Sequence, residues 1–185
     1  MASQIPPLPI FGLLLILDQY PSLPEHSDYE PEIDVRAGAH SDYGTVTLLF
    51  QRRSQPGLEI FTPTSTWSPV PITPSGTEID PLPPILINIG DLLSYWTNGL
   101  LKSTVHRVIF PQETRRGGQD RYSIAYFCHP ANETDLVPVP SELVRRKAGE
   151  DGCDGGEGRR VMTAEEHLNS RLAATYGWGK QDEPT

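Results

Sequence analysis

The stretch "GAHSDYGTVTLLFQ", residues 38–51, decides the fold because it joins a polar pair to a run with the composition of a strand. Residues 45–50 alternate between β-branched and apolar side chains, which predicts a β-strand. In extended chain the side chains of His40 and Asp42, two positions apart, point to the same side. The pair could hold one metal ion, but it is a weak signal without a third ligand.

Further β-rich segments lie on both sides of this stretch, separated by turns rich in Pro, Gly, Ser and Asp. They are residues 10–17, 57–62, 67–72, 85–89, 103–110 and 121–128. We expect 10–17 to be buried, 57–62 to neighbour the 45–50 strand, and the proline-interrupted 67–72 to lie at an edge. Many short strands without βαβ alternation predict an antiparallel sandwich or barrel of the jelly-roll type.

Helical signals are few. Residues 92–101 fit a helical turn or a tight corner, and Thr163-Ala-Glu-Glu166 is a capping box that predicts a helix over 164–176. Leu168, Leu172 and Tyr176 share one face of that helix, which we expect to pack on the outside of a sheet. Residues 148–160 are predicted to be a flexible insertion. One domain over residues 1–185 is expected, with its core at about 10–138.

Composition excludes several classes of function. The 185 residues carry a formal net charge of −9, and their basic residues are scattered, which argues against a nucleic-acid partner. The apolar run 10–17 is too short to span a membrane. Two cysteines give no disulfide framework, so a reducing, cytoplasmic location is expected. Composition leaves the oligomeric state open.

Two further constellations bear on the His40–Asp42 pair. His106, in the segment 103–110, is the candidate third ligand, and two histidines with one carboxylate suit non-haem Fe(II) while leaving positions open. Arg121 and Ser123 alternate along the next segment and so share a face. The planar guanidinium suits bidentate binding of a carboxylate, which predicts an anchor for an acid co-substrate.

With these residues in place, the sequence resembles the iron(II)- and 2-oxoglutarate-dependent dioxygenases, in particular their isopenicillin N synthase-like branch. The resemblance covers about residues 13–130 and rests on motifs in the family's order: His40-Ser-Asp42-Tyr-Gly44, Asn88-Ile-Gly-Asp91, Trp96-Thr-Asn98, Lys102-Ser-Thr-Val-His106-Arg-Val108 and Arg121-Tyr-Ser123. It implies a double-stranded β-helix, or jelly roll, with a C-terminal helix. The family's helical N-terminal region and first core strands have no counterpart before Leu13, so an N-terminally truncated fold is expected.

The resemblance also implies the roles of individual residues. His40, Asp42 and His106 would be the catalytic iron ligands, and Arg121 and Ser123 would bind the distal carboxylate of 2-oxoglutarate. The family's Asn-x-Tyr stands here as Asp18-Gln-Tyr20, which keeps the phenol as a further co-substrate contact. Fe(II), O₂ and 2-oxoglutarate would then hydroxylate, desaturate or cyclise a small organic substrate, in secondary metabolism by family analogy.

Two alternatives stay open at this point. One is a related iron oxidase that uses O₂ without 2-oxoglutarate, and the other is a non-catalytic truncated fragment that retains the metal site. Asn88 and Asp91 are expected to shape the turn before residues 92–101. Phe127, on the strand of Arg121, is expected to be a core aromatic or a substrate contact.

Overall fold

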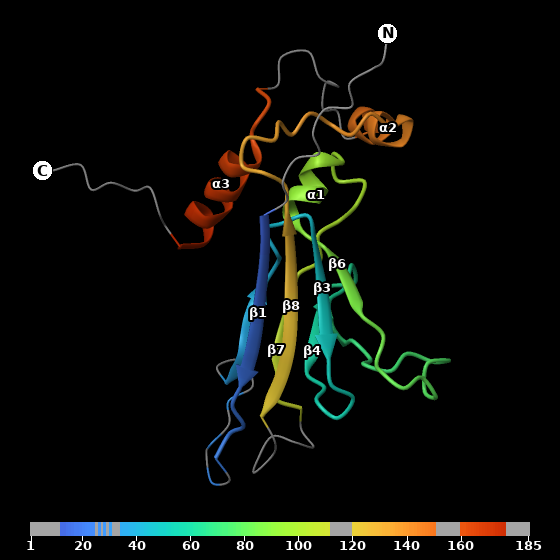
Figure 1. The fold of residues 1–185 in the computed structure, drawn as a ribbon, viewed down its shortest axis with the longest axis vertical. Coiled ribbons are helices and arrows are strands. Elements are labelled where there is room, and N and C mark those ends of the chain that lie inside the picture. Colours follow the sequence, from blue (N-terminus) through green and yellow to red (C-terminus); the bar gives the residue numbers. More distant parts are fainter. Residues whose placement is uncertain are drawn as a thin grey trace, which may run out of the picture.

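The structure is a computed structural model, and it describes residues 12–24, 26, 28, 30, 34–111, 120–150 and 160–176. Two four-stranded sheets face each other, and the helices gather at one end of them (Figure 1). The strand pairs within both sheets are antiparallel. The arrangement is the expected jelly roll. None of the helices in the described ranges has the length and apolar character needed to cross a bilayer.

The two sheets, called sheet I and sheet II, each combine strands from distant parts of the sequence. Sheet I has the order β1 (Gly12–Tyr20), β8 (Arg121–His129), β3 (Val46–Gln51) and β6 (Leu86–Ile89). Sheet II has the order β2 (Val35–His40), β7 (His106–Ile109), β4 (Leu58–Phe61) and β5 (Trp67–Pro69). The edge position predicted for 67–72 is confirmed for β5.

Strands β3 and β4 are not neighbours, so that expectation is wrong. The connection between them crosses from sheet I to sheet II, and the side chain of Gln55 anchors it. Its amide nitrogen donates to the Asp120 carbonyl oxygen at 2.9 Å, and its oxygen accepts from the Tyr122 backbone N–H at 2.7 Å. The turn therefore satisfies its polar groups against β8, which lets β4 leave the sheet of β3.

Strand β8 shows why sheet I has two unlike faces. Arg121, Ser123 and Ala125 point to the inner side and are buried, in keeping with the period of two along a strand. On the outer side, Leu17 of β1 lies opposite Ile124, and Ile124 lies opposite Phe50 of β3. All three outer side chains are exposed, so the outer face of sheet I is apolar and uncovered by the described residues.

The run in β1 is therefore not the buried strand that its composition predicts. Leu15 and Leu17 are 63% and 68% exposed, because β1 is an edge strand of sheet I and no described element packs over it. A strand of continuous apolar residues is normally covered on both faces. Here the sequence pattern is right about the strand and wrong about its surroundings.

Helix α1 (Asp91–Trp96) and helix α3 (Ala164–Tyr176) pack against each other at the end of the sheets (Figure 1). The predicted capping box forms, with the Thr163 N–H donating to the Glu166 carboxylate at 3.1 Å and the Glu166 N–H to the Thr163 hydroxyl at 3.2 Å. His167 is buried and its ring lies 5.3 Å from that of Tyr95 in α1. The α3 face that packs is thus not the one expected.

The expected face, with Leu168, Leu172 and Tyr176, is only half-buried, and Tyr176 is exposed. The helix docks through its first turns onto α1, where Arg171 Nε also lies 2.8 Å from a carboxylate oxygen of Asp91. Helix α2 (Glu142–Glu150) was not expected from the sequence. It includes residues 148–150 of the predicted flexible insertion, and residues 151–159 lie outside the described ranges.

Two glycines bring α1 against the loop that follows β2. A Cβ added to Gly90 would lie 2.3 Å from the Gly44 carbonyl oxygen, so only glycine allows this approach without a shift. The approach lets the Asp91 N–H donate to the Asp42 carbonyl at 2.7 Å and the Leu92 N–H to the Gly44 carbonyl at 3.1 Å. The loop carrying Asp42 is thereby fixed to the start of the helix.

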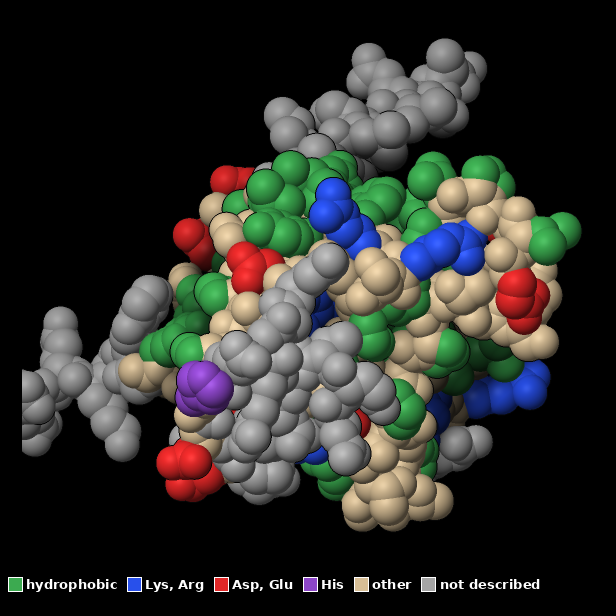
Figure 2. All heavy atoms as spheres, turned by 90° about the horizontal axis from the view of Figure 1, so that it is seen from below, with side chains coloured by type: hydrophobic (Ala, Val, Ile, Leu, Met, Phe, Trp, Pro, Cys, Tyr) green, Lys and Arg blue, Asp and Glu red, His purple; other side chains and the backbone are tan. Residues whose placement is uncertain are grey.

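The charged side chains do not gather on the end of the molecule seen in Figure 2. Lys and Arg side chains lie apart from one another there, among apolar and acidic side chains. Apolar side chains reach the surface in several places on this view.

Candidate metal and co-substrate site

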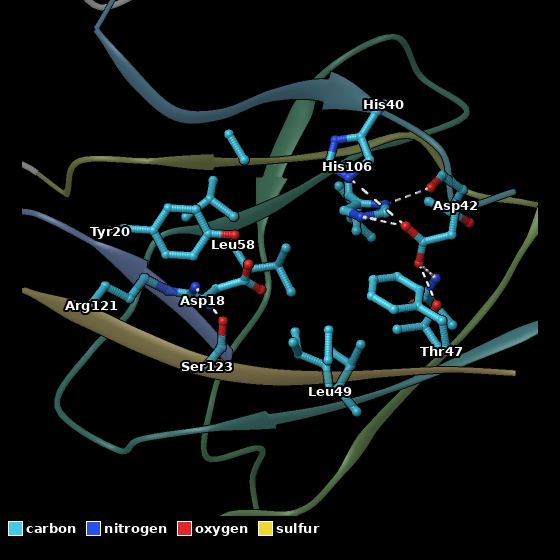
Figure 3. A pocket seen from close by; sticks show the side chains of 18 residues that line it. Asp18, Tyr20, His40, Asp42, Thr47, Leu49, Leu58, His106, Arg121 and Ser123 are labelled. Carbon is cyan, nitrogen blue, oxygen red and sulfur yellow. Dashed lines mark hydrogen bonds and ion pairs between the residues drawn. The ribbon is translucent and has the colours of Figure 1, made fainter. Parts of the chain in front are cut away.

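Three of the sequence-predicted residues converge at one end of a cavity between the sheets. His40 ends β2, His106 begins β7, and Asp42 lies in the loop just after β2. The Nε2 atoms of His40 and His106 lie 3.8 and 3.6 Å from Asp42 Oδ1, and one donor atom from each residue lies within 4.8 Å of the others. Figure 3 shows the three side chains turned toward a common point.

The route to this convergence differs from the expected one. The sequence predicts His40 and Asp42 on one face of an extended segment, but β2 ends at His40 and Asp42 lies beyond it. Strand β2 is irregular in its pairing with β7, with register shifts between Val35 and Ala37 and between Ala37 and His40. Such bulges re-aim side chains, and this one pairs His40 directly opposite His106.

Backbone carbonyls orient both imidazole rings. The Nδ1 atom of His40 lies 2.7 Å from the Gly38 carbonyl oxygen, and Nδ1 of His106 lies 3.1 Å from that of Thr104. A carbonyl only accepts, so each Nδ1 acts as the donor, and Nε2 is the ring nitrogen directed toward Asp42. A metal-ligating histidine commonly has this arrangement, with the other ring nitrogen held by a backbone carbonyl.

Asp42 is held by two neighbours in sheet I. Its Oδ2 accepts a hydrogen bond from the Thr47 hydroxyl at 2.5 Å and from the Asn88 amide at 2.7 Å. Both bonds fall on one carboxylate oxygen, while Oδ1 faces the histidines. Asn88 was expected to shape the turn before α1, and the role of its amide in holding Asp42 was missed from the sequence. An amide at an inward position of an otherwise apolar strand was the signal that could have found it.

Arg121 and Ser123 lie at the other end of the cavity, on β8 of the opposite sheet. Arg121 is 1% exposed, and its Nη atoms donate to the Ser123 hydroxyl at 3.1 Å and to the Gln51 side-chain oxygen at 3.2 Å. Its Nε is buried and has no hydrogen-bond partner among the described residues. Burial lowers the pKa of this guanidinium, and Tyr20 and Asp18 oppose that effect.

Tyr20 lies with this group, as expected. It pairs across the strands with Arg121, whose guanidinium lies over the phenol ring at 5.3 Å from the ring centre. The phenol shares a hydrogen bond with the Asp18 carboxyl, and burial, with the nearby Asp18 charge, raises the pKa of Tyr20. Asp18 in turn pairs across the strands with Ser123, which brings a carboxyl group into the same end of the cavity.

The cavity that joins the two ends has a volume of about 250 Å³. Apolar side chains line its middle, and polar groups lie at the two ends (Figure 3). Phe127 is among the lining residues, so it faces the cavity rather than an apolar core. A cavity with apolar walls and a few convergent polar groups is typical of a small-molecule site.

Comparison with known proteins decides the family. The family model of the 2OG-Fe(II) oxygenase superfamily matches residues 12–130. The chain belongs to the 2OG-Fe(II) oxygenase superfamily. The match spans every strand of both sheets, together with all six residues predicted from the sequence to form the site.

The relatives of this chain within the 2OG-Fe(II) oxygenase superfamily include fungal proteins. The chain is 40% identical over 161 residues to "UPF0676 protein C1494.01" of Schizosaccharomyces pombe, covering 85% of this chain and 42% of that protein. It is 37% identical over 163 residues to "Proline hydroxylase buaE" of Petromyces alliaceus, covering 88% and 46%. A full-length Neurospora crassa protein, solved in complex with alpha-KG, is 32% identical, with a TM-score of 0.64, covering 89% and 45%.

The chain thus spans less than half the length of each of these three proteins. Within the part it shares with the 2OG-Fe(II) oxygenases, the residues present fit the groups that the family is named for. Two imidazole nitrogens and one carboxylate oxygen match the donor set of non-haem Fe(II). The buried guanidinium, with its orphaned Nε, matches the need of a carboxylate for charged donors.

Proposed function

We propose that the protein oxidises a small organic molecule with Fe(II), O₂ and 2-oxoglutarate, by hydroxylation, desaturation or ring closure. The observation that carries the proposal is the shared cavity: the His40, Asp42 and His106 donors lie at one end and the Arg121 guanidinium at the other. A diacid with a 2-oxo group needs a metal for one end and a cation for the other.

In this proposal the chain's own residues bind and orient. His40, Asp42 and His106 hold the iron, while Arg121, Ser123 and Tyr20 hold the distal carboxylate of 2-oxoglutarate. The bound metal supplies the redox chemistry that couples conversion of 2-oxoglutarate and O₂ to succinate and CO₂ with oxidation of the substrate. Thr47 and Asn88 keep one oxygen of Asp42 occupied, so that the other is directed at the ion.

The substrate, the branch and the setting are also proposals. The apolar middle of the cavity favours a small organic substrate, and relatives described as 2-oxoglutarate-dependent dioxygenases of fungi support a role in secondary metabolism. We assign the protein to the isopenicillin N synthase-like branch on its motifs. We also propose a single domain over residues 1–185 and a cytoplasmic location, where Cys128 would stay reduced.

An anaerobic titration tests the roles of the two ends of the cavity. The protein with Fe(II) should develop the weak visible band of a chelated 2-oxo acid when 2-oxoglutarate is added. We expect His106→Ala to abolish the band and Arg121→Ala to shift its midpoint to at least about tenfold higher 2-oxoglutarate, since a lost charged hydrogen bond costs about 1.5–3 kcal/mol. His26→Ala and Arg52→Ala, at exposed positions, are the matched controls.

The same titration separates the alternatives. A band that persists in both His106→Ala and Arg121→Ala would refute these roles. Substrate oxidation without release of succinate would favour the oxidase that needs no 2-oxoglutarate. A band with no turnover of any substrate would favour the non-catalytic alternative.

A further inference from the structure

The Arg121 end of the cavity already contains a carboxylate of its own. Asp18 and Tyr20 alternate on β1, so both face inward, and they pair across the strands with Ser123 and Arg121. Directly opposed residues of an antiparallel pair lie about 4.5–5.5 Å apart at Cβ. Figure 3 shows the Asp18 side chain beside Arg121 and Ser123, at the end of the cavity opposite the two histidines.

Arg121 is the one arginine or lysine among the described residues that line the cavity, and Asp18 and a bound carboxylate would both lie near it. In the free protein burial is the main cause of the pKa shift of both Asp18 and Arg121, and the charge of each also acts on the pKa of the other. A dicarboxylate bound at Arg121 would add a second carboxylate to the same water-poor site. Two carboxylates that share a site cannot both stay ionised at ordinary cost, so one of them gains a proton.

We propose that Asp18 takes up one proton when 2-oxoglutarate binds at Arg121, so that affinity for the co-substrate depends on the protonation of this residue. The inference rests on the proposed function and deepens it. The proton comes from solvent and is held on Asp18 as a carboxylic acid. That acid donates a hydrogen bond to the arriving carboxylate, and no covalent bond of the co-substrate changes.

The surroundings of Asp18 favour this residue as the proton acceptor. Burial already raises the pKa of its carboxyl, against the opposing effects of the Arg121 charge and the hydrogen bond with Tyr20. The ligand would bury the carboxyl further and share the guanidinium with it, and both changes raise the pKa again. The fourth side chain at this end, Ser123, carries no charge.

Other charged groups also act on this end of the cavity. Arg36 of β2 in sheet II is close enough to Arg121 for the two charges to repel, and Asp120 acts on Arg36 in turn. The imidazoles of His40 and His106 and the carboxylate of Asp42 line the far end of the cavity. These groups are the same in the wild type and in Asp18 variants, so a comparison of variants isolates Asp18.

The linkage has a defined sign. Between the pKa of Asp18 in the free protein and its higher value in the complex, one proton is taken up per ligand. The Kd for 2-oxoglutarate then rises about tenfold for each unit of pH, because one unit corresponds to about 1.36 kcal/mol. Below the pKa of Asp18 in the free protein and above its pKa in the complex, binding takes up no proton and the Kd does not change with pH.

Calorimetry measures the uptake directly. The protein loaded with Mn(II), which does not start the oxidation, is titrated with 2-oxoglutarate in two buffers of different ionisation enthalpy, over a series of pH values. The difference in heat gives the number of protons taken up. We expect a maximum of about one proton for the wild type.

Asp18→Asn keeps the shape and removes the titration. We expect it to show no such uptake, and to bind 2-oxoglutarate more tightly than the wild type at the alkaline end of the series, where the wild-type carboxylate competes. Asp18→Ala is a second variant should the amide disturb folding, and Asp28→Asn, at an exposed position, should behave as the wild type.

Each remaining outcome overturns a different statement. If the wild type binds 2-oxoglutarate without proton uptake, or if Asp18→Asn keeps the uptake, the role of Asp18 is wrong while the proposed function stands. If 2-oxoglutarate binds neither protein at any pH, although Mn(II) does, the proposed function fails and the inference fails with it.

Discussion

Asp42 is the best supported of the three candidate iron ligands. Its side chain is 7% exposed, compared with 15% for His106 and 46% for His40, and two hydrogen bonds hold its Oδ2. A cation bound beside this buried carboxylate would balance its charge. Thr47 and Asn88 therefore hold the Asp42 carboxylate in place, and a bound metal ion would offset the cost of burying it.

Removing the Asn88 amide tests this support. We expect Asn88→Ala to lower the affinity for Fe(II) about 10- to 100-fold, the usual effect of losing a group that orients a ligand. The measurement is a competition titration with a metal-binding dye under anaerobic conditions. Asn132→Ala, at an exposed site, is the control. Equal affinities for the two variants would contradict the role.

For single residues, the sequence indicates the candidate metal ligands better than it indicates the residues that hold those ligands in place. His40, Asp42 and His106 carry side chains that bind metals wherever they stand, and their grouping was predicted. Thr47 and Asn88 act only because β3 pairs with β6 in a register that sets Thr47 opposite Asn88. That register depends on contacts between segments far apart in the chain, and no local pattern reports it.

Among the elements, the loop after β2 and the start of α1 determine where Asp42 stands. The Asp91 and Leu92 N–H groups donate to carbonyls of this loop, and the Gly90 N–H donates to the Thr45 carbonyl at 2.8 Å. The first N–H groups of a helix have no partner within the helix. Here they bind the loop, so the position of Asp42 follows the position of the helix.

A methyl group at Gly90 should disturb this contact. Its Cβ would lie 2.3 Å from the Gly44 carbonyl oxygen, which is backbone and has little freedom to move. We expect Gly90→Ala to lower the free energy of unfolding by about 1–3 kcal/mol, the usual cost of overpacking, and to weaken metal binding as Asp42 shifts. Urea unfolding and the dye titration measure the two effects.

Gly38→Ala is the matched control, because a Cβ at that position meets nothing within 4 Å. We expect its stability to equal that of the wild type within about 0.5 kcal/mol. If Gly90→Ala unfolds at the same urea concentration as Gly38→Ala, the close approach of the two segments is not the constraint described here.

The type of each element was easier to predict than its neighbours. The capping box indicated the start of α3, because a cap is a local contact within four residues. The partners of β4 and the docking face of α3 were both predicted wrongly. The partners of β4 depend on how the chain crosses between the sheets, and the docking face of α3 depends on the surface of α1. The sequences of β4 and α3 alone contain neither kind of information.

For the molecule as a whole, the outer face of sheet I is the unusual surface. Its exposed apolar residues come from all four strands: Leu15, Leu17, Phe50, Ile87 and Ile124. Soluble proteins seldom leave a continuous apolar area of this kind in water. The composition could not predict it, since 37% hydrophobic residues is an ordinary value and the exposure depends on the arrangement of the strands.

This surface should bind a hydrophobic dye. We expect the protein to enhance the fluorescence of anilinonaphthalene sulfonate in its folded state, and the double variant Phe50→Thr, Ile87→Thr to lose most of that signal. Ile79→Thr is the control, because Ile79 is 94% exposed but lies outside the sheet. Equal fluorescence for all three proteins would show that the dye does not recognise this face.

The unequal exposure of the three candidate ligands affects how a metal ion would bind to the site and dissociate from it. His40 stands at the rim with nearly half of its side chain in water, whereas Asp42 and His106 lie deeper. Release of a single imidazole at the rim would give solvent and small chelators access to the ion while the sheets stay closed. Exchange of the metal would then be governed by one side-chain rotation, and purification in the presence of a chelator would strip the protein without unfolding it.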